Sequence, residues 1–472
     1  MRADRIVPLI IAVALFMENM DSTVIATALP AIAKDIGTNP LALKLAVTSY
    51  LLSLAVFIPA SGWTADRFGA RTVFRAAIGV FVIGSIGCAL SGSLTDFVIA
   101  RVVQGMGGAM MTPVGRMVLV RTIPKRELVN AMTWVTTPAL IGPVLGPPVG
   151  GFITTYATWH WIFLINVPMG ILGIILASRY IEELKVEHHA PFDLVGMTLS
   201  GLGIAGVAFG FSVLGLNFLP WWIVVALIGG GIAAIAAYLV HAKRTPHPAL
   251  DLDLFRVPTF FVSVVGGFVF RMGIGALPFL LPLMLQIGFG MTPFQSGLVT
   301  FASAVGAMTM KMAAARILRR LGFRTVMLTN AVISASFLAV CATFTSTTSV
   351  FWMFGLLLIG GFFRSLQFTS INTLAYADVE PERVSRATSL VSVAQQLAIS
   401  TGVAFGALAV DITQRVRGSE VLGAHDFPPA FLAVAAVSMI SVLFFVRLHA
   451  DAGAELSNRT HLRAPKTEQK PA

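Results

Sequence analysis

Two carboxylates lie one helical turn apart inside an apolar stretch near the N-terminus. Glu18 and Asp21 are three residues apart, so a helix places both side chains on one face. A charge in hydrocarbon costs roughly 2.5–3.5 kcal/mol on insertion scales, so each carboxylate needs a partner, an aqueous cavity or a function. A carboxyl group that alternates between burial and the company of an arginine can bind and release a proton. The alternative is a structural role, with capping by Ser22 or Thr23 or an ion pair to an arginine.

Basic residues interrupt other apolar stretches. Arg101 shares a helix face with Gln104, where it can bind a carboxylate or a backbone carbonyl; snorkelling to the membrane surface is the alternative. Snorkelling is also the favoured interpretation of Arg116 and Lys311. Arg271 lies near the middle of its stretch, so we expect it to face a cavity or a partner.

Polar side chains on later stretches indicate a substrate path, and hydrogen bonding between helices is the equally weighted alternative. The candidate path residues are Gln104, Arg271, Arg364, Gln367, Gln395 and Gln396.

The composition indicates an integral membrane protein. Of 472 residues, 56% are hydrophobic and only 12% are charged, whereas soluble domains carry about 25% charged residues. Cys88 and Cys341 lie far apart and predict neither a disulfide nor a metal site. No phosphate-binding loop or hydrolase motif is present, so we expect no enzyme activity, no metal and no cofactor. Fourteen apolar spans are predicted near 6–29, 43–63, 73–91, 97–120, 131–155, 160–180, 194–215, 219–241, 258–287, 296–317, 324–343, 348–375, 389–411 and 427–448.

The distribution of lysine and arginine predicts the orientation. The termini and the loops after even-numbered spans carry 24 of the 33 basic residues, and the opposite loops carry 4. Short cytoplasmic loops are enriched in basic residues, so both termini should be cytoplasmic. The net charge of +11 therefore reflects contact with a lipid bilayer, and nucleic-acid binding is not expected.

The loop after the second span predicts a conformational gate. Gly62 allows a close helix approach, Gly69 permits a tight turn, and Asp66 can pair with Arg67 or Arg71. Such a loop can latch one conformation by charge pairing and release it in another. A basic loop that only sets topology is the alternative.

A weak internal repeat predicts two helix bundles. Gly69 and Arg71 match Gly322 and Arg324 after the tenth span, whereas Asp66 is replaced by Arg319. The expected units are an N-terminal six-helix bundle (1–190), two inserted helices with their loops (191–257), a C-terminal six-helix bundle (258–450) and a polar, disordered cytoplasmic tail (451–472).

The fifth span carries glycines at every fourth position. Gly142, Gly146 and Gly150 form a smooth stripe that lets a neighbouring helix pack closely. Pro143 and Pro147 introduce kinks that membrane helices tolerate. Ordinary helix packing accounts for this pattern without a further role.

The sequence resembles the fourteen-helix drug:H+ antiporters of the major facilitator superfamily, and within them the multidrug-resistance exporters. The resemblance is carried by the motifs at 20–30, 62–71, 101–108, 142–151, 159–168 and 192–196 and covers nearly the whole chain. It implies an all-α membrane fold of two six-helix bundles plus two inserted helices, working by alternating access. Thr27 departs from the family, because many members have asparagine there.

The same resemblance implies roles for individual residues. Asp21 would couple transport to protons and Arg101 would take part in proton transfer. Asp66 and Arg71 would act in gating. The glycine-proline motif of the fifth span, with Gly142, Pro143, Gly146 and Gly150, is associated with export. The role of Glu18 rests on the physical argument alone.

The sequence therefore predicts a proton-driven exporter of amphipathic or aromatic small molecules in the cytoplasmic (inner) membrane. A periplasmic adaptor protein is a further candidate partner. One alternative keeps the fold but exports a single specific metabolite. Another is a membrane sensor or scaffold that transports nothing.

Overall fold

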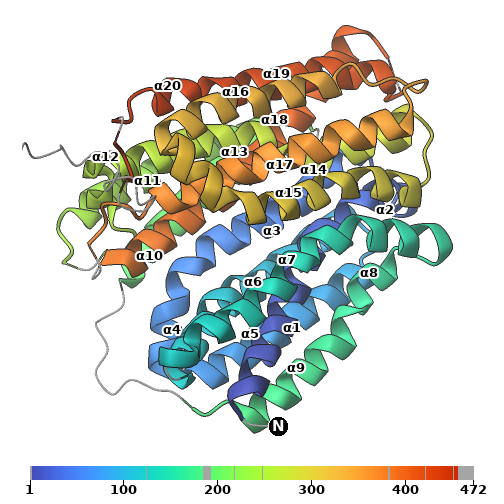
Figure 1. Cartoon of the computed structure of the whole chain (residues 1–472). Helices are drawn as coiled ribbons and strands as arrows, with labels where there is room; N and C mark the ends of the chain where they lie inside the picture. The colour runs from blue at the N-terminus through green and yellow to red at the C-terminus, as the bar shows by residue number, and fades with distance from the viewer. Residues whose placement is uncertain are drawn as a thin grey trace, which may run out of the picture.

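The computed structural model describes residues 3–123, 125–183, 193–216, 218–246, 248–380, 383–419, 421–449 and 451–454. All regular secondary structure in these residues is helical (Figure 1). Within hydrocarbon every backbone N–H and C=O needs an internal partner, which a helix supplies along its whole length. The predicted all-α membrane class is confirmed. Most of the predicted C-terminal tail, 455–472, lies outside the described residues.

The N-terminal helices run to residue 180. They are α1 (Ala3–Val24), η1 (Ile25–Thr27), α2 (Leu29–Asp35), η2 (Pro40–Leu43), α3 (Lys44–Phe57), η3 (Ile58–Ala60), α4 (Ser61–Phe68), α5 (Ala70–Leu90), α6 (Leu94–Thr122), α7 (Lys125–Tyr156), α8 (His160–Leu164) and α9 (Asn166–Tyr180).

The remaining helices begin at residue 194. They are α10 (Leu194–Val213), α11 (Trp221–Ala242), η4 (Leu252–Arg256), α12 (Pro258–Phe261), η5 (Val262–Gly266), α13 (Gly267–Gly275), α14 (Leu277–Leu283), η6 (Met284–Gly288), α15 (Pro293–Leu321), α16 (Phe323–Cys341), α17 (Val350–Leu374), α18 (Val384–Val416), η8 (Ala424–Asp426), α19 (Phe427–Ile440) and α20 (Val442–Phe445).

Thirteen of the predicted spans coincide with described helical segments that are long and apolar enough to cross a membrane. The remaining predicted span, at 131–155, corresponds to α7, which has 32 residues and four internal prolines. Proline and glycine contribute little hydrophobicity, so this helix matches the others in length but not in apolar character. It packs against α1 and α15 in the middle of the molecule, where contact with lipid is not required.

The helix contacts follow the internal repeat. In the N-terminal helices α1 packs against α7, α3 against α6, and α5 against α6. The matching pairs eight spans later, α13 with α18, α15 with α17, and α16 with α17, are also in contact. Two further contacts join the two sets: α3 meets α18, and α7 meets α15. These two are equivalent to each other under the repeat, as expected for two halves related by pseudo-symmetry.

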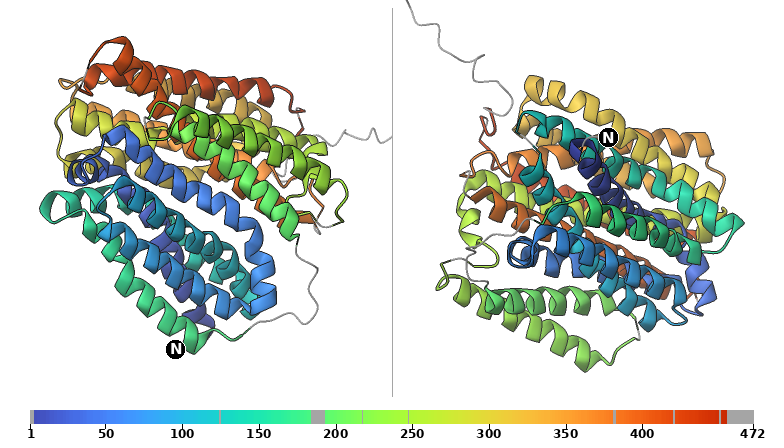
Figure 2. Two further views of the ribbon diagram at one scale, coloured as in Figure 1. Left: turned by 180° about the vertical axis from the view of Figure 1, so that it is seen from behind. Right: turned by 90° about the horizontal axis from the view of Figure 1, so that it is seen from below.

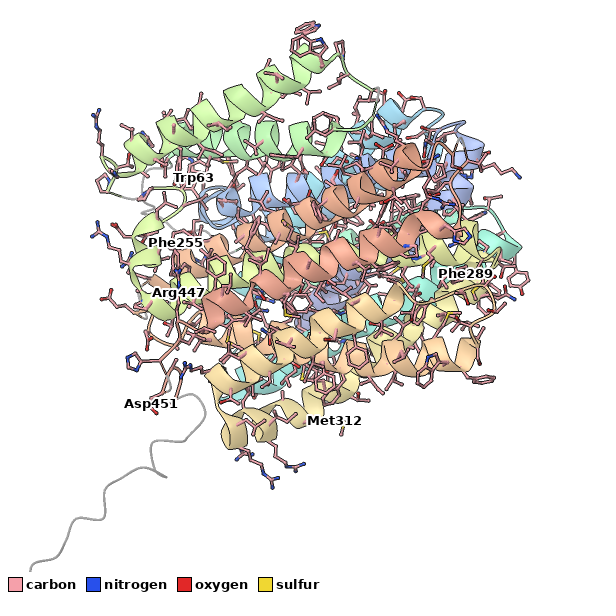
Figure 3. The ribbon with its side chains drawn as sticks, turned by 90° about the horizontal axis from the view of Figure 1, so that it is seen from above. Trp63, Phe255, Phe289, Met312, Arg447 and Asp451 are labelled. Atoms are coloured by element: carbon pink, nitrogen blue, oxygen red, sulfur yellow. The ribbon has the colours of Figure 1, made fainter. Side chains whose placement is uncertain are left out.

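Alternate turns lie at opposite ends of the helices. Figure 3 shows Trp63, Phe255, Arg447 and Asp451 at one end and Phe289 at the other. Trp63 lies just before the connection that follows the second span, Phe255 lies in the connection after the eighth, and Arg447 and Asp451 follow the fourteenth. Phe289 lies in the connection after the ninth span. The chain therefore crosses from one end of the molecule to the other at each span.

The two inserted helices lie on the outside. α10 packs on α11, α3 and α18, and the pair covers one flank (Figure 2). Only 17% of the apolar stretch of α11 is buried inside the protein, whereas 78% of the apolar stretch within Pro40–Phe68 is buried. Because its exposed side chains, such as Trp221 and Val225, are large and apolar, this flank is suited to lipid.

Candidate functional site

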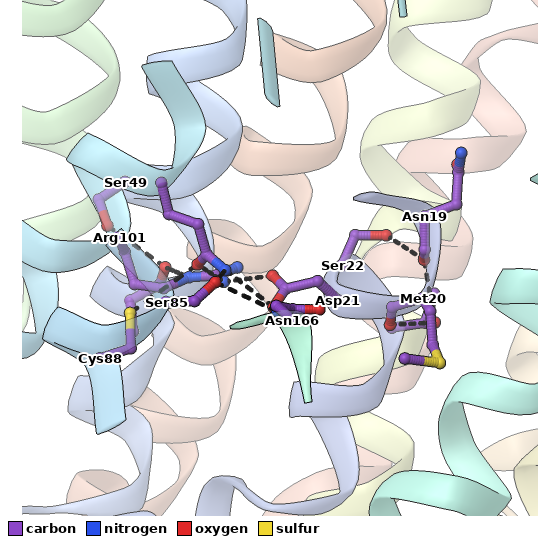
Figure 4. Close-up of polar contacts among 12 residues, drawn as sticks. Asn19, Met20, Asp21, Ser22, Ser49, Ser85, Cys88, Arg101 and Asn166 are labelled. Carbon is purple, nitrogen blue, oxygen red and sulfur yellow. Dashed lines mark hydrogen bonds and ion pairs between the residues drawn. The ribbon is translucent and has the colours of Figure 1, made fainter. Parts of the chain in front are cut away.

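A buried ion pair joins α1 to α6. Arg101 Nη1 lies 2.7 Å from Asp21 Oδ2, and both side chains are about 1% exposed or less (Figure 4). The Arg101 Nε donates to the Ala46 carbonyl of α3 at 3.2 Å, and the guanidinium lies 4.2 Å from the centre of the Tyr50 ring. Removing one partner of such a buried pair typically costs 3–5 kcal/mol, because the other charge stays desolvated. The structure thus brings together two residues that the sequence singled out separately.

Neutral amides complete the shell around Asp21. Gln104 Nε2 donates to Asp21 Oδ1 at 2.8 Å, and Asn166 Nδ2 donates to the same oxygen at 2.9 Å. Both amides also donate to the Ser85 hydroxyl, at 2.8 and 3.2 Å. Gln104 therefore belongs to the carboxylate network, and it is fully buried. Asn166 and Ser85 were not predicted as site residues; an asparagine inside an apolar span was the available signal for the first.

Glycines allow the helices around this network to approach closely. A Cβ on Gly84 would meet the Gln104 backbone, and one on Gly107 would meet the backbone of Phe81, so α5 and α6 touch backbone to backbone. A Cβ on Gly105 would lie 2.6 Å from the Ser53 Cβ of α3. The small residues of the predicted motif on α6 therefore set the distances from α6, which carries Arg101, to α5 and α3.

Glu18 faces a different environment from Asp21. Its Oε2 accepts a hydrogen bond of 2.7 Å from the Thr112 hydroxyl, and its side chain lines a cavity of about 270 Å³. Arg101 and Tyr50 line the same cavity. A hydroxyl can donate to a carboxylate or accept from a carboxylic acid, so Thr112 can serve both protonation states of Glu18.

A second cavity of about 530 Å³ lies between the N-terminal and C-terminal helices. It shares Thr23, Gln395 and Ile399 with the first cavity, so the two are adjacent. Its walls come mainly from α1, α7, α14, α15 and α17. Phenylalanine and methionine contribute Phe368 and Met308, whereas most of the remaining apolar lining is aliphatic or proline. The apolar part of the lining therefore consists mainly of aliphatic side chains and proline.

The predicted path residues fall into two groups. Arg364, Gln395 and Gln396 line the cavities. Arg271 lies behind the wall, with Nη2 donating to the cavity-lining Asn372 Oδ1 at 2.6 Å. Gln367 lines neither cavity and instead bonds with Asn330 and with the Met327 carbonyl. That geometry is the helix-to-helix hydrogen bonding that the sequence left open as the alternative.

The glycine stripe of α7 packs against α1. A Cβ on Gly142 would lie 2.9 Å from the Phe16 carbonyl oxygen, and at Gly146 and Gly150 it would meet Thr23 and the Val24 carbonyl. Close packing is thus confirmed by the geometry. The helix runs without interruption through all its prolines, and Pro143 and Pro147 line the 530 Å³ cavity. The proline side of α7 faces the cavity while its glycine side holds α1.

The predicted gating loop, residues 62–71, covers the end of α4 and the start of α5 and forms ion pairs with distant residues. Asp66 Oδ1 lies 2.8 Å from Arg121 Nη2, at the end of α6, and Arg71 Nε lies 3.4 Å from Glu183 Oε2, beyond α9. Arg121 and Glu183 were missed, because nothing in the local spacing identifies partners so far along the chain.

Two glycines of this loop behave differently. Gly69 has a φ of 92°, as a tight turn requires. At Gly62 the expected close helix approach is absent, since a Cβ there would meet no atom of the described residues within 4 Å.

Among the described residues, no group of three or more histidine, cysteine, aspartate or glutamate side chains is arranged to hold a metal ion. The site therefore consists of a buried ion pair, a second carboxylate on a cavity wall, and a larger cavity lined by basic and apolar side chains.

This combination of repeated helix contacts, a central cavity and a buried charge pair is that of a membrane transporter. The chain belongs to the Major Facilitator Superfamily, whose family model matches residues 11–240 and 263–470. Members of this family are transporters, so the expectation of no enzyme activity is confirmed.

Curated relatives cover almost the whole chain. The chain is 39% identical over 450 residues to the "Putative multidrug resistance protein MdtD" of Salmonella heidelberg (strain SL476), which covers 94% of each protein. The protein of that name from Salmonella typhimurium (strain LT2) has the same identity and coverage.

Solved structures confirm the fold. A D-xylose-proton symporter matches with a TM-score of 0.67 at 16% identity, covering 95% of this chain and 98% of that one. The nucleoside transporter NupG matches with a TM-score of 0.65 at 12% identity, covering 93% and 99%. At such low identity these matches speak for the architecture alone.

Proposed function

We propose that this chain exports amphipathic or aromatic small molecules across the cytoplasmic (inner) membrane in exchange for protons, with both termini in the cytoplasm. The observation that carries this proposal is the buried Asp21–Arg101 pair beside a cavity that Glu18 also lines. A carrier that uses a proton gradient needs a titratable group away from bulk water and next to its substrate. The name of the relatives supports drugs as substrates.

Proton binding at Asp21 is tied to movement of Arg101. If Asp21 took up a proton in the present geometry, Arg101 would keep a buried charge without a carboxylate partner. Arg101 also lines the cavity that holds Glu18, so a second arrangement is within its reach. In the proposed cycle Asp21 gains a proton from outside, Arg101 turns towards the cavity, and the proton is released inside.

Alternating access supplies the rest of the cycle. We propose that residues 1–190 and 258–450 move as two bundles about the contacts α3–α18 and α7–α15, with 191–257 as a peripheral insert. The ion pairs Asp66–Arg121 and Arg71–Glu183 all lie within the first bundle. They would hold the end of α4 to the end of α6, and the start of α5 to the segment after α9, while the interface opens.

Export of one specific metabolite, with the same fold, is the second candidate function. The larger cavity favours it through polar groups in fixed hydrogen bonds, since Arg364 donates to Ser303 and Arg271 donates to Asn372. A non-transporting sensor or scaffold would leave the cavities and the buried ion pair without a use.

Reconstitution into vesicles tests the proposal. The purified full-length protein is placed in liposomes with a pH-sensitive dye inside, and a panel of neutral, anionic and cationic amphipathic compounds is added. Proton movement that starts on addition of several unrelated compounds, which compete with one another, is the expected result. Proton movement with one compound class alone would favour the specific exporter, and none with any compound would contradict proton-coupled transport.

A further inference from the structure

The larger cavity carries positive charge without a matching carboxylate. Arg364 from α17 and Lys311 from α15 both line it, and its described lining includes no aspartate or glutamate. The carboxylate of Glu18 lines the neighbouring cavity, not this one. A charge withdrawn from water is costly unless something neutralises it, which applies to the half-buried Arg364 more than to the exposed Lys311.

The partners of these two cations are weak. Arg364 Nη2 donates to the Ser303 hydroxyl at 2.7 Å, a neutral group, and no ion pair of Arg364 or Lys311 is found in the described part of the chain. A guanidinium has five N–H donors in a planar fork that matches the two oxygens of a carboxylate. Ser303 occupies one donor of Arg364, whose side chain also lines the cavity.

A third cation reinforces the positive potential from behind the wall. Arg271 is 1% exposed, its Nε has no hydrogen-bond partner, and its Nη2 donates to Asn372. Its guanidinium also lies 5.5 Å from the centre of the Phe368 ring. Since Asn372 and Phe368 both line the cavity, this charge acts on the same space through one layer of side chains.

Much of the remaining wall is apolar. Leu140, Val144, Ile274, Leu277 and Leu281 contribute to it, and the volume of about 530 Å³ suits a ligand of one or two rings. An apolar body and a single anionic group would therefore each meet complementary surface.

We propose that the preferred substrates are amphipathic organic anions, with an aromatic or aliphatic body and one carboxylate that Arg364 and Lys311 bind. The ligand supplies the counter-ion that the protein itself lacks in this cavity. The physiological meaning of this inference rests on the proposed transport function. The binding preference itself can be tested without any transport measurement. The inference assigns proton coupling to Asp21 and Glu18 in the N-terminal half. It assigns recognition of the substrate's charge to Arg364 and Lys311 in the C-terminal half.

A matched set of ligands tests the charge preference without any mutation. 1-Naphthoate, 1-naphthamide and 1-naphthylmethylammonium share a ring system and differ mainly in charge. Binding to the purified full-length protein in detergent is measured by isothermal titration calorimetry. We expect 1-naphthoate to bind at least about tenfold more tightly than the amide, as charge-assisted hydrogen bonds imply, and the ammonium to bind most weakly. Equal or tighter binding of the amide or the ammonium overturns the inference, as does no binding of any of the three.

Variants locate the preference in the cavity. Arg364→Gln and Lys311→Gln should each reduce the preference for naphthoate over naphthamide about three- to tenfold, while naphthamide affinity stays within about twofold. Arg316→Gln removes one positive charge from the same helix outside the cavity and should leave the preference unchanged. A preference that survives in both cavity variants, or falls equally in the control, contradicts the assignment. The wild-type comparison remains decisive if a cavity variant fails to fold.

Transport in vesicles separates the two proposals. Proton movement driven by the ammonium but not by naphthoate would keep the transport function and overturn the anion preference. Tight naphthoate binding without proton movement by any compound would keep the anion site and overturn proton-coupled transport.

Discussion

Arg101 and Arg364 lie on the fourth long helix of their respective halves, α6 and α17, yet their surroundings differ. Arg101 has a carboxylate partner at 2.7 Å, whereas Arg364 donates to a serine hydroxyl. Arg271, a buried arginine of the C-terminal helices, likewise donates to a neutral group, the Asn372 side chain. One half of a repeated architecture supplies its own counter-ion, and the other leaves that position to a ligand. In the proposed mechanism, proton binding and substrate binding are divided between the two halves of a shared fold.

The two repeated turns show the same division on a smaller scale. Gly69 and Gly322 have φ values of 92° and 78°. Arg71 and Arg324 donate to the equivalent carbonyls of Ile181 and Val446, at 3.5 and 3.4 Å. The backbone solution is therefore common to both halves. The ion pairs of Asp66 and Glu183 belong to the first turn, since Arg319 and Leu448 occupy the matching positions in the second.

The largest expected effect comes from breaking the buried pair. Arg101→Met should lower the free energy of unfolding by about 3–5 kcal/mol, because Asp21 stays buried and charged without its partner. Adding Asp21→Asn to Arg101→Met should recover a large part of that loss. Thermal unfolding in detergent, read as a double-mutant cycle, measures the coupling. Additive losses would show that the two side chains do not act as a pair.

Packing, unlike charge, should respond alike in the two halves. Gly146 on α7 meets α1, and Gly402 on α18 meets the Met272 carbonyl of α13. Gly146→Val and Gly402→Val should each cost about 1–3 kcal/mol through overpacking, seen as a lower unfolding temperature. Gly229→Val on α11 is the control, since a Cβ there meets nothing within 4 Å. Equal losses at all three sites would mean that close approach is not what these glycines provide.

Removing an arginine from the C-terminal half should be nearly free of cost. Arg271→Met replaces a buried charge, which has no carboxylate partner among the described residues, by an apolar side chain of similar length. The change in the free energy of unfolding should therefore stay within about 1 kcal/mol or be stabilising. Comparison of its unfolding temperature with that of Arg101→Met sharpens the contrast between the halves. A loss of stability in Arg271→Met as large as that in Arg101→Met would show that the two buried arginines do not differ in how they are stabilised.

The smallest effect on stability should come from the first turn. Asp66 and Arg121 are 29% and 33% exposed, so Asp66→Asn should cost no more than about 1 kcal/mol. Transport is the more sensitive measurement: Asp66→Arg should slow it, and the exchange Asp66→Arg with Arg121→Asp should restore it. Failure of the exchange to restore the rate would show that the pair does not act through its charges.

The sequence predicted the architecture well because long apolar spans leave little choice of structure. It also identified Asp21 and Arg101 as candidate site residues, since a charge in an apolar span requires explanation. It did not reveal that they contact each other, because 80 residues separate them and only tertiary packing joins α1 to α6. Gln367 shows the converse: its residue type suits a substrate path and a helix contact equally, and only its neighbours decide.

The central claim is that Asp21 couples substrate movement to protons. Its most direct test is substrate-dependent proton movement in vesicles, comparing the wild type with Asp21→Asn at matched protein amounts and with substrate binding measured in parallel. The account predicts that proton movement disappears in the variant while the folded protein still binds substrate. Proton movement that persists in Asp21→Asn and disappears in Glu18→Gln would contradict it and assign coupling to Glu18.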